Sequence, residues 1–301
     1  MKDIRFSIVI PAYNASESII TTLDCVAAQT YRNFEVIIID DKSNDAEALA
    51  AVVQGERYRD LNINLVLSQE KLNGAGARNK GIDLATGDFI SFLDADDEWR
   101  ADKLMLAAKK IEELEAQGKS RYVIFSQVNI IQDGNFLKVM PMQPVAKGET
   151  VAEYLFGCYG FIQTSTIVLK REYAAEIKFD TRYVRHQDYD FCIRADRLGF
   201  EFFMIDQPLT NYHLITTFGS KHKGESVKYS HFWLDSMKPY LTQRDIHTYK
   251  AYKLPLRYKM DGKSLLASVS FARYFFLTNK DNRTYFINRL KDKVKGRFAG
   301  K

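Results

Sequence analysis

Short runs of consecutive apolar residues alternate with helix-like segments through the first hundred residues, and this alternation constrains the fold more than any other feature. The runs cover 6–10, 36–39, 63–67 and 89–93. Each is rich in β-branched and aromatic side chains and lacks the polar alternation of a half-exposed strand. Repeated units of buried strand and helix predict an α/β fold with a parallel, doubly wound sheet.

Two of the predicted helices begin with the same local signal. Asn14 is followed three residues later by Glu17, and Asn44 is followed in the same way by Glu47. An asparagine with a glutamate at that spacing is typical of a capping box, in which each side chain bonds a backbone N–H at the helix start. We therefore expect helices to begin directly after the first two strands.

The loops that follow the four strands are expected to share one cleft, because ligands of such sheets bind beyond the carboxyl ends of the strands. These loops are Pro11-Ala12-Tyr13, Asp40-Asp41, 73–78 and 94–97. Together they hold an aromatic ring, a carboxylate suited to a nucleobase N–H, an arginine and an acidic cluster. This combination favours a nucleotide diphosphate ligand. The glycines of 74–78 do not predict NAD binding, because the third glycine of that fingerprint is absent and the loop follows the third strand.

The acidic cluster ends the fourth strand, in the stretch GDFISFLDADDEW over 87–99. In extended chain, Asp94 and Asp96 point to one side and Asp97 to the other. Two carboxylates on one side can share a hard cation such as Mg²⁺ or Mn²⁺. An isolated motif of this kind is also explained by a solvated acidic turn that caps the next helix.

The pattern changes after a predicted helix over 102–115. A hairpin is expected around Asp133-Gly134, and a helix and a return strand are expected over 151–156 and 163–169, giving a mixed-sheet wall and an acceptor surface. Asp188 falls in the first turn of a predicted helix over 188–199, where the helix dipole favours a carboxylate. It is also a candidate general base, a role that needs one carboxylate near the reacting hydroxyl.

The C-terminal part is strongly basic. Residues 244–301 hold 15 Lys+Arg against 4 Asp+Glu, a net charge of +11, whereas residues 1–243 carry −6. Such a segment can bind the phosphates of anionic lipid, lipid-linked pyrophosphate or nucleic acid, or it can be a solubilising helical surface. Aromatic and aliphatic residues at helical spacing over 265–276 either pack on the domain or form an interfacial membrane helix.

The cellular compartment is predicted from features that the sequence lacks, namely paired cysteines, a signal peptide and a membrane-spanning segment. Cys25, Cys158 and Cys192 are widely spaced and show no ligand pattern, so we expect reduced cysteines and no structural zinc. Only five clean apolar residues precede Pro11, and no window of eighteen apolar residues exists. We therefore expect a cytoplasmic protein, with peripheral association at the inner face of the plasma membrane as a further hypothesis.

Four stretches together resemble the large family 2 of inverting, GT-A-fold glycosyltransferases. They are FSIVIPAYNASESI (6–19), EVIIIDDKSND (35–45), NGAGARNKGIDLATGDFISFLDADDEW (73–99) and FDTRYVRHQDYDFCIRADRLG (179–199). The resemblance implies a GT-A (Rossmann-like) mixed sheet flanked by helices. It fades beyond about residue 215, so the basic, largely helical C-terminal extension over 216–301 is predicted from its charge and helical spacing alone. Residues 1–105 would form the nucleotide-sugar-binding half and 106–215 the acceptor half. The implied ligands are a nucleotide-sugar donor, usually a UDP-sugar, and Mn²⁺ or Mg²⁺.

Site roles carry over by position. The resemblance implies that six residues contact the nucleotide sugar. They run from the base pocket to the diphosphate and metal end in the order Pro11, Tyr13, Asp41, Arg78, Asp94 and Asp96. Asp96 would be the principal metal ligand, with Asp94 facing the ribose or the metal. Family members commonly have Glu-Asp where this chain has Gln187-Asp188, so the base position is kept at Asp188 and an acidic role at Gln187 is lost. His213 is most simply structural, with phosphate contact as the alternative.

The expected reaction is transfer of a sugar, with inversion, to a hydroxyl of a saccharide acceptor. Bacterial surface-polysaccharide (O-antigen or capsule) assembly would supply a lipid-pyrophosphate-linked acceptor, and no nucleic acid partner is expected. Two alternatives differ in class. A sugar-nucleotide pyrophosphorylase would need a glycine-rich, basic first loop, which this chain replaces with Pro11-Ala12-Tyr13. A non-catalytic nucleotide-sugar-binding protein is suggested only by Gln187.

Overall fold

The computed structural model describes residues 3–214 and 226–298, with side chains as far as Lys291. The chain divides into two compact units. The sheet unit comprises 1–144 and 162–217, and the helical unit comprises 145–161 and 218–301. The sequence analysis places residues 145–161 in the acceptor half, but in the structure they pack with the C-terminal helices.

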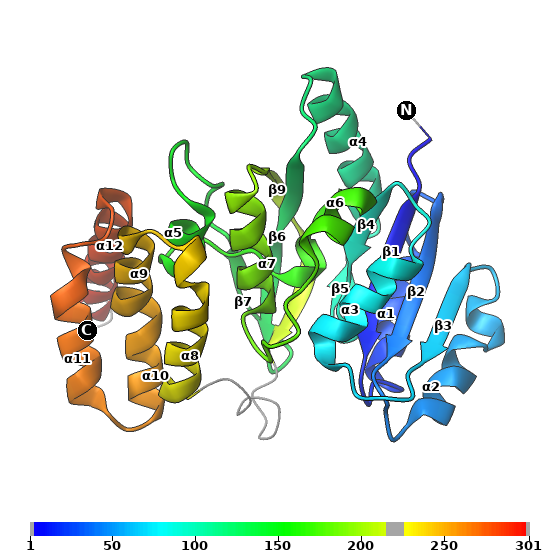
Figure 1. Ribbon diagram of the computed structural model, residues 1–301, viewed down its shortest axis with the longest axis horizontal. Helices are drawn as coiled ribbons and strands as arrows, with labels where there is room; N and C mark the ends of the chain where they lie inside the picture. Colours follow the sequence, from blue (N-terminus) through cyan, green and yellow to red (C-terminus); the bar gives the residue numbers. More distant parts are fainter. Residues whose placement is uncertain (1–2, 215–225, 299–301) are drawn as a thin grey trace. The chain divides into compact units, whose positions relative to one another are not determined.

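A mixed sheet forms the centre of the sheet unit (Figure 1). Its strand order is β3-β2-β1-β4-β8-β6-β9-β5, with β7 paired to β6. The strands are β1 (Phe6–Ala12), β2 (Phe34–Asp40), β3 (Ile63–Leu67), β4 (Phe89–Phe92), β5 (Glu98–Trp99), β6 (Tyr122–Gln132), β7 (Asn135–Met140), β8 (Val168–Lys170) and β9 (Glu201–Leu214). The first four are mutually parallel, as the repeated strand and helix units predict. β8 then runs antiparallel to β4 and β6 antiparallel to β8, so the second half departs from a wholly parallel sheet.

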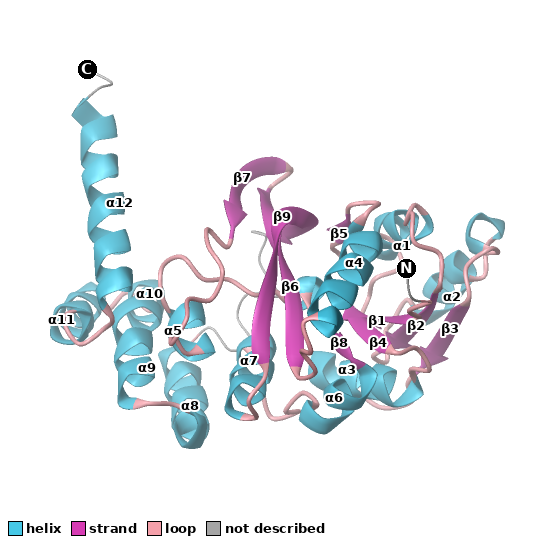
Figure 2. Ribbon diagram, turned by 90° about the horizontal axis from the view of Figure 1, so that it is seen from above, coloured by secondary structure: helices cyan, strands magenta, loops and turns pink. Residues whose placement is uncertain are grey.

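Helices cover both faces of this sheet (Figure 2). They are α1 (Ser18–Ala27), α2 (Ala46–Val53), α3 (Asn73–Leu84), α4 (Lys103–Ala116), α6 (Arg171–Ile177) and α7 (Gln187–Arg197). Side chains of α1, α2 and α4 form one core with alternate residues of β1, including Phe6, Ile8 and Ile10. Each fully buried side chain of this size stabilises the fold by about 1.5–3 kcal/mol relative to exposure. Val9 points to the other face, against Gly81 of α3.

The loops after β1 and β2 bond to each other, and the two predicted capping boxes are wrong. Neither α1 nor α2 has a side-chain cap. The Asn14 side chain instead accepts a hydrogen bond from the Asn44 N–H at 2.9 Å, and Asp45 accepts one from the Ser16 N–H at 2.9 Å. Asn14 has a left-handed backbone (φ 50°), which directs its side chain across to the neighbouring loop. A non-local bond therefore takes the Asn14 oxygen that the local pattern assigns to the start of α1, and the two bonds together hold the loops side by side.

The helical unit has its own core of aromatic rings. Its elements are α5 (Val151–Phe156), α8 (Val227–Met237), α9 (Gln243–Thr248), a π-helical turn (Tyr249–Lys253), α10 (Leu254–Met260), α11 (Ser264–Phe275) and α12 (Lys280–Phe298). The rings of Phe156, Trp233 and Tyr249 pack with centroids 5.1–5.9 Å apart. Thr150 caps α5 and also donates to Asp245 of α9 at 2.5 Å, which holds the short helix against the others. Among the described residues, no helix is long and apolar enough to cross a membrane.

Lys103 is an unusual member of the core of the sheet unit. It is 2% exposed, and its ammonium group lies 3.4 Å from the Thr166 carbonyl oxygen and 5.0 Å from the Trp99 ring. Within the described ranges, no carboxylate forms an ion pair with it. Burial lowers the pKa of Lys103 to about 7.

We expect Lys103→Met to raise the free energy of unfolding by about 1–3 kcal/mol near pH 6 and by less near pH 9. The folded-state pKa lies below the value of ~10.4 in unfolded chain, so the unfolded chain binds more protons between these values and wild-type stability rises with pH there. Denaturant unfolding at the two pH values measures this. Lys109→Met, on the exposed side of the same helix, is the control, and an equal gain at both pH values would contradict the argument.

Candidate active site

A cavity of about 710 Å³ opens beyond the carboxyl ends of the parallel strands. The side chains that line it include all six predicted nucleotide-sugar positions, Pro11, Tyr13, Asp41, Arg78, Asp94 and Asp96. They come from the end of β1, from the loops after β1, β2 and β4, and from α3. The structure therefore brings together residues that lie as far as 85 positions apart in the sequence.

At one end of the cavity, Asp41 is held by a network of donors. Its Oδ1 accepts backbone N–H groups of Leu72 and Asn73 at 2.5 and 3.0 Å, and its Oδ2 pairs with the Lys71 ammonium at 2.8 Å. The same ammonium lies 2.8 Å from the ring centroid of Tyr13, which is half exposed. The sequence analysis missed Lys71, whose importance arises only because β2 and β3 are neighbours. This end offers an aromatic face and fixed polar groups, as a nucleobase requires.

Arg78 joins three parts of the site. It is 8% exposed, and its guanidinium pairs with Asp94 after β4 and donates to Gln187 Oε1 at 2.7 Å at the start of α7. The Gln187 amide also donates to the Tyr183 carbonyl oxygen at 2.7 Å. A glutamate at 187 would lack that donor and would face the carbonyl with a charge. The neutral amide therefore suits this position.

The acidic segment turns, which corrects the geometry expected from the sequence. β4 ends at Phe92, and the Asp97 N–H donates to the Asp94 carbonyl oxygen at 3.1 Å, so the chain is not extended here. Asp94 and Asp96 nevertheless both line the cavity, while Asp97 is 1% exposed. Asp97 accepts hydrogen bonds from Ser165 Oγ at 2.6 Å and Gln163 Nε2 at 2.7 Å. The turn, and not strand alternation, separates the two open carboxylates from the buried one.

Burial and the neighbouring carboxylates raise the pKa of two of the three acids in this turn. Partial desolvation by the cavity walls, and then the Asp94 charge, raise the pKa of Asp96 to about 6. Burial raises the pKa of Asp97 well above its ordinary value, with Asp94 and Asp96 adding to the effect. Burial and the same negative charges also raise the pKa of Tyr212 on β9, so its phenol stays neutral. Tyr212 is a second residue that the sequence analysis did not assign to the site.

Asp188 lies in the first turn of α7, half-buried, and its Oδ1 accepts the Tyr189 N–H at 2.9 Å. Burial raises the pKa of Asp188 to about 6. The Arg78 guanidinium lowers this pKa and the Asp94 carboxylate raises it, so the three groups are electrostatically coupled. The next carboxylate on the helix, Asp190, is 1% exposed and pairs with Arg194 at 2.6 Å, a structural role. Of these two carboxylates Asp188 is therefore the candidate base, because Asp190 is committed to its ion pair with Arg194.

His213 lies on β9, where its Nε2 is 2.9 Å from Glu98 Oε1. Its backbone N–H lies 3.4 Å from Asp97 Oδ1. Both side chains of the pair are about one-third exposed, at 34% and 32%. His213 thus tethers β9 to β5 beside the acidic turn, while the phosphate contact considered from the sequence stays a prediction.

The donor set suits a divalent cation whose coordination is completed by a ligand. Among the described residues, no group of three or more His, Cys, Asp or Glu could hold a metal ion. Asp96 opens into the cavity beside Asp94, and their mutual repulsion is relieved when positive charge lies between them. Carboxylate oxygens are ligands that Mg²⁺ and Mn²⁺ prefer, and these ions are commonly bound by one or two carboxylates plus substrate phosphates.

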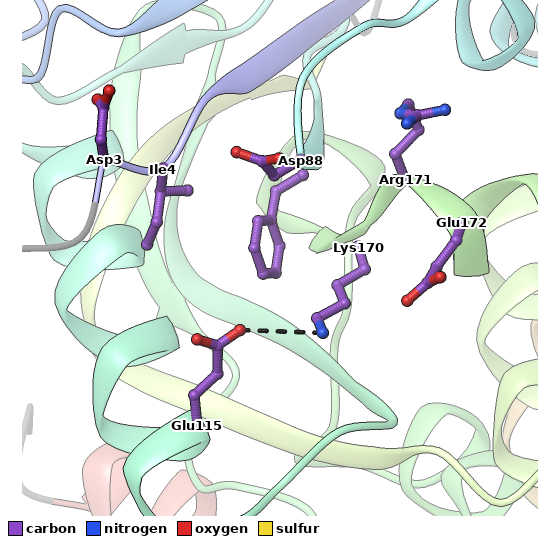
Figure 3. Close-up of a pocket in the computed structure, with 8 residues that line it drawn as sticks. Asp3, Ile4, Asp88, Glu115, Lys170, Arg171 and Glu172 are labelled. Atoms are coloured by element: carbon purple, nitrogen blue, oxygen red, sulfur yellow. Dashed lines mark ion pairs between the residues drawn. The ribbon is translucent and has the colours of Figure 1, made fainter.

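A second cavity, of about 370 Å³, lies where β1 and β4 begin, and Figure 3 shows its lining. Its charges are satisfied by neighbouring groups. The Lys170 ammonium and the Glu115 carboxylate face one another at 3.9 Å, and Arg171 Nε donates to the Gly87 carbonyl oxygen at 2.9 Å. Ligands of α/β sheets collect at the opposite, carboxyl ends of the strands. The larger cavity is therefore the candidate active site.

Comparison with known proteins identifies the family. The model of glycosyl transferase family 2 matches residues 7–171, more than half of the chain. The chain belongs to glycosyltransferase family 2. It is 73% identical over 301 residues, the whole of both chains, to the amylovoran biosynthesis glycosyltransferase AmsB of Erwinia amylovora. It is 29% identical over 220 residues, 72% of this chain and 78% of the other, to an Escherichia coli UDP-Glc:alpha-D-GlcNAc-diphosphoundecaprenol beta-1,3-glucosyltransferase.

Solved structures show the same fold. S. aureus TarS 1–349 in complex with UDP-GlcNAc has a TM-score of 0.66 at 17% identity, over 92% of this chain and 82% of that one. The mannosyltransferase of Pyrobaculum calidifontis in complex with GDP-Man and Mn²⁺ has a TM-score of 0.61 at 18% identity, over 97% and 81%. The expected GT-A fold is confirmed, and this family 2 protein is a glycosyltransferase. A sugar-nucleotide pyrophosphorylase and a non-catalytic binder are set aside.

Ser165 holds the acidic turn from both ends, because its Oγ donates to Asp97 and accepts the Asp94 N–H at 2.9 Å. We expect Ser165→Ala to lower the free energy of unfolding by about 1–3 kcal/mol, the cost of leaving buried partners unsatisfied, and to lower turnover. Ser91→Ala is a matched control, since Ser91 Oγ is equally buried but has no hydrogen-bond partner among the described residues. Denaturant unfolding compares the two, and equal losses would contradict the clamp.

Proposed function

We propose that this glycosyltransferase transfers a hexose, with inversion and dependence on a divalent cation, from a UDP-sugar to a hydroxyl of a lipid-pyrophosphate-linked saccharide in bacterial surface-polysaccharide assembly. The observation that carries the proposal is that Asp94 and Asp96 line one cavity with Arg78, while Asp188, which is not part of the lining, lies close enough to Arg78 and Asp94 for their charges to shift its pKa. The names of related proteins support the donor and acceptor classes, because one of them states both UDP-Glc and a diphosphoundecaprenol-linked sugar. The 73% identical relative is named for polysaccharide biosynthesis.

The donor would lie along the cavity with its base at the Tyr13 end. Pro11 and Tyr13 would pack on the uracil, and the Asp41 carboxylate would accept its N–H. Arg78 would contact the base or the diphosphate, and Asp94 would face the ribose or share the cation with Asp96. A bound Mn²⁺ or Mg²⁺ would supply positive charge opposite the diphosphate as it leaves.

Asp188 would act as general base on the acceptor. Its carboxylate takes the proton from the acceptor hydroxyl as that oxygen attacks the anomeric carbon. The new bond from carbon to the acceptor oxygen forms on one face while the bond to the diphosphate oxygen breaks on the other, so the configuration inverts. An α-linked donor therefore gives a β-glycoside without a covalent enzyme intermediate.

The acceptor would determine where the enzyme works. A lipid-pyrophosphate-linked saccharide is anchored in the membrane, so the enzyme would act at its cytoplasmic face as a peripheral protein. The net charge of +11 over residues 244–301 supports this, because anionic lipid attracts such a segment. No nucleic acid is part of the proposal.

We expect UDP binding to require Mn²⁺ or Mg²⁺ and Asp96→Asn to abolish that requirement while lowering turnover about 10²-fold or more. The reason is that Asp96 is the exposed carboxylate of the acidic turn and lines the cavity. Calorimetric titration of UDP with added Mn²⁺ or EDTA measures binding, and sugar transfer measures turnover. The control is Asp60→Asn, which makes the same chemical change at a side chain that is 88% exposed and is not part of the cavity lining. Full wild-type activity in EDTA would overturn the metal proposal.

We expect Asp188→Asn to lower kcat about 10²-fold or more and to leave the affinity for UDP nearly unchanged. Because the pKa of Asp188 is about 6, the wild-type kcat should fall as pH drops below ~6, where the base becomes protonated. The control is Asp190→Asn, which should lower stability through Arg194 and spare most of kcat. Steady-state kinetics across this pH range decide the assignment, and a normal kcat in Asp188→Asn would place the base elsewhere.

A further inference from the structure

Helix α11 is apolar on two opposite sides, and only one of them is covered. Its inner side packs in a cluster where the rings of Phe271, Phe275 and Phe286 have centroids 4.9–5.6 Å apart. Its outer side carries Leu265 and Val269, 77% and 53% exposed, and Phe276 follows directly after its last turn at 76%. An ordinary surface helix has a polar outer face, whereas a helix that is apolar all round is found in a core or against lipid.

The exposed side chains form one stripe and not a scatter. Positions 265, 269 and 276 are four and seven residues apart, a spacing that keeps them on one side of a helix. Leu266 and Leu277, each 49% exposed, widen the stripe at its two ends. Single exposed apolar residues need no explanation, but a contiguous group of this kind marks an interaction surface. We call these five residues the α11 stripe.

Basic side chains surround the α11 stripe. Lys263 directly precedes α11, Arg273 lies in its last turn beside the apolar side chains, and Lys280 begins α12; all three are exposed. Two exposed or half-exposed acids adjoin them, Asp261, which lies 3.9 Å from Lys263, and Asp281, which follows Lys280, so the three basic residues still outnumber the acids. The surface thus combines apolar area with positive charge. This combination complements an anionic bilayer better than it complements the same surface of a second copy of the chain. In a twofold dimer the same patch would face itself and bring like charges together.

We propose that the α11 stripe and its basic rim form a membrane-binding surface, in which the apolar side chains enter the boundary between headgroups and acyl chains and the basic ones pair with anionic phospholipid. The proposal deepens the function above and rests on its lipid-linked acceptor. A helix that lies in the interface in this way needs no membrane-spanning segment. Apolar insertion and charge attraction contribute separately, so each can be removed by itself.

Sedimentation of the full chain with vesicles tests both contributions. The vesicles contain phosphatidylcholine alone or phosphatidylcholine with phosphatidylglycerol. We expect strong binding only to the anionic vesicles, with release at molar salt, where the screening length is ~3 Å. The triple variant Leu265→Gln, Val269→Gln and Phe276→Gln should lower partitioning about 100-fold or more. The triple variant Lys263→Gln, Arg273→Gln and Lys280→Gln should lower it about 10-fold or more.

Matched controls alter equally exposed residues of the sheet unit. Phe136→Gln with Leu137→Gln changes two side chains of β7 that are 61% and 52% exposed, and Arg59→Gln, Lys109→Gln and Arg197→Gln remove three exposed charges. We expect these controls to bind vesicles as the wild type does. All variants are checked by thermal unfolding and by transfer to an acceptor without lipid. That second assay reports the proposed function, so failure of the function and failure of membrane binding are distinguishable.

Three results would overturn the proposal. One is normal vesicle binding by the apolar triple variant. Another is equal, salt-insensitive binding to neutral and anionic vesicles. The third is that light scattering shows the wild type to be a dimer and the apolar triple variant to be a monomer, while the wild type does not bind vesicles. This result would assign the α11 stripe to contact with a second copy of the chain.

Discussion

The buried Arg78 guanidinium is the interaction on which the candidate active site depends. A charge that is 8% exposed is tolerated only when it is paired and hydrogen-bonded, and Asp94 and Gln187 supply both. These partners lie 16 and 109 positions away along the chain. One planar side chain thereby fixes the acidic turn after β4 relative to the start of α7. Lysine could not replace it, because a single ammonium does not present a rigid fork of donors to two partners.

The acidic turn shows why the site needs this support. Three carboxylates within four residues repel one another, and burial adds to the cost of charging them. The protein offsets part of this with neutral donors, since Gln163 and Ser165 both donate to Asp97. Asp97 is thus held by hydrogen bonds, Asp94 by an ion pair, and Asp96 is left open to the cavity. The division of roles within one short turn follows from which partners reach each carboxylate.

The sequence predicts the first half of the fold well because its signals are local. β1, β2 and β4 are buried strands and continuous apolar runs, and parallel neighbours follow from the intervening helices. The prediction that 63–67 is also buried is wrong, because β3 is the edge strand and its residues are half-buried or exposed. β9 was not predicted, because its fourteen residues include charges and Pro208 and pair with β6 through shifts in register. The same limit applies to the site. Motifs identify Asp94, Asp96 and Asp188, but Lys71, Gln163 and Tyr212 belong to no motif and enter the site only through non-local pairing of strands and loops.

Arg78 also links the charge of the acidic turn to the pKa of Asp188, the proposed base. The pKa of Asp188 is raised by burial and by Asp94, and Arg78 opposes both effects. Without that opposition the carboxylate would be protonated over more of the neutral range and could not accept a proton. Because Arg78 pairs directly with Asp94, it also reduces the negative charge that Asp188 experiences from the acidic turn. Arg78 therefore both positions the acidic turn and, together with the hydrogen bond from the Tyr189 N–H, lowers the pKa of the proposed base, so the two effects are coupled through one side chain.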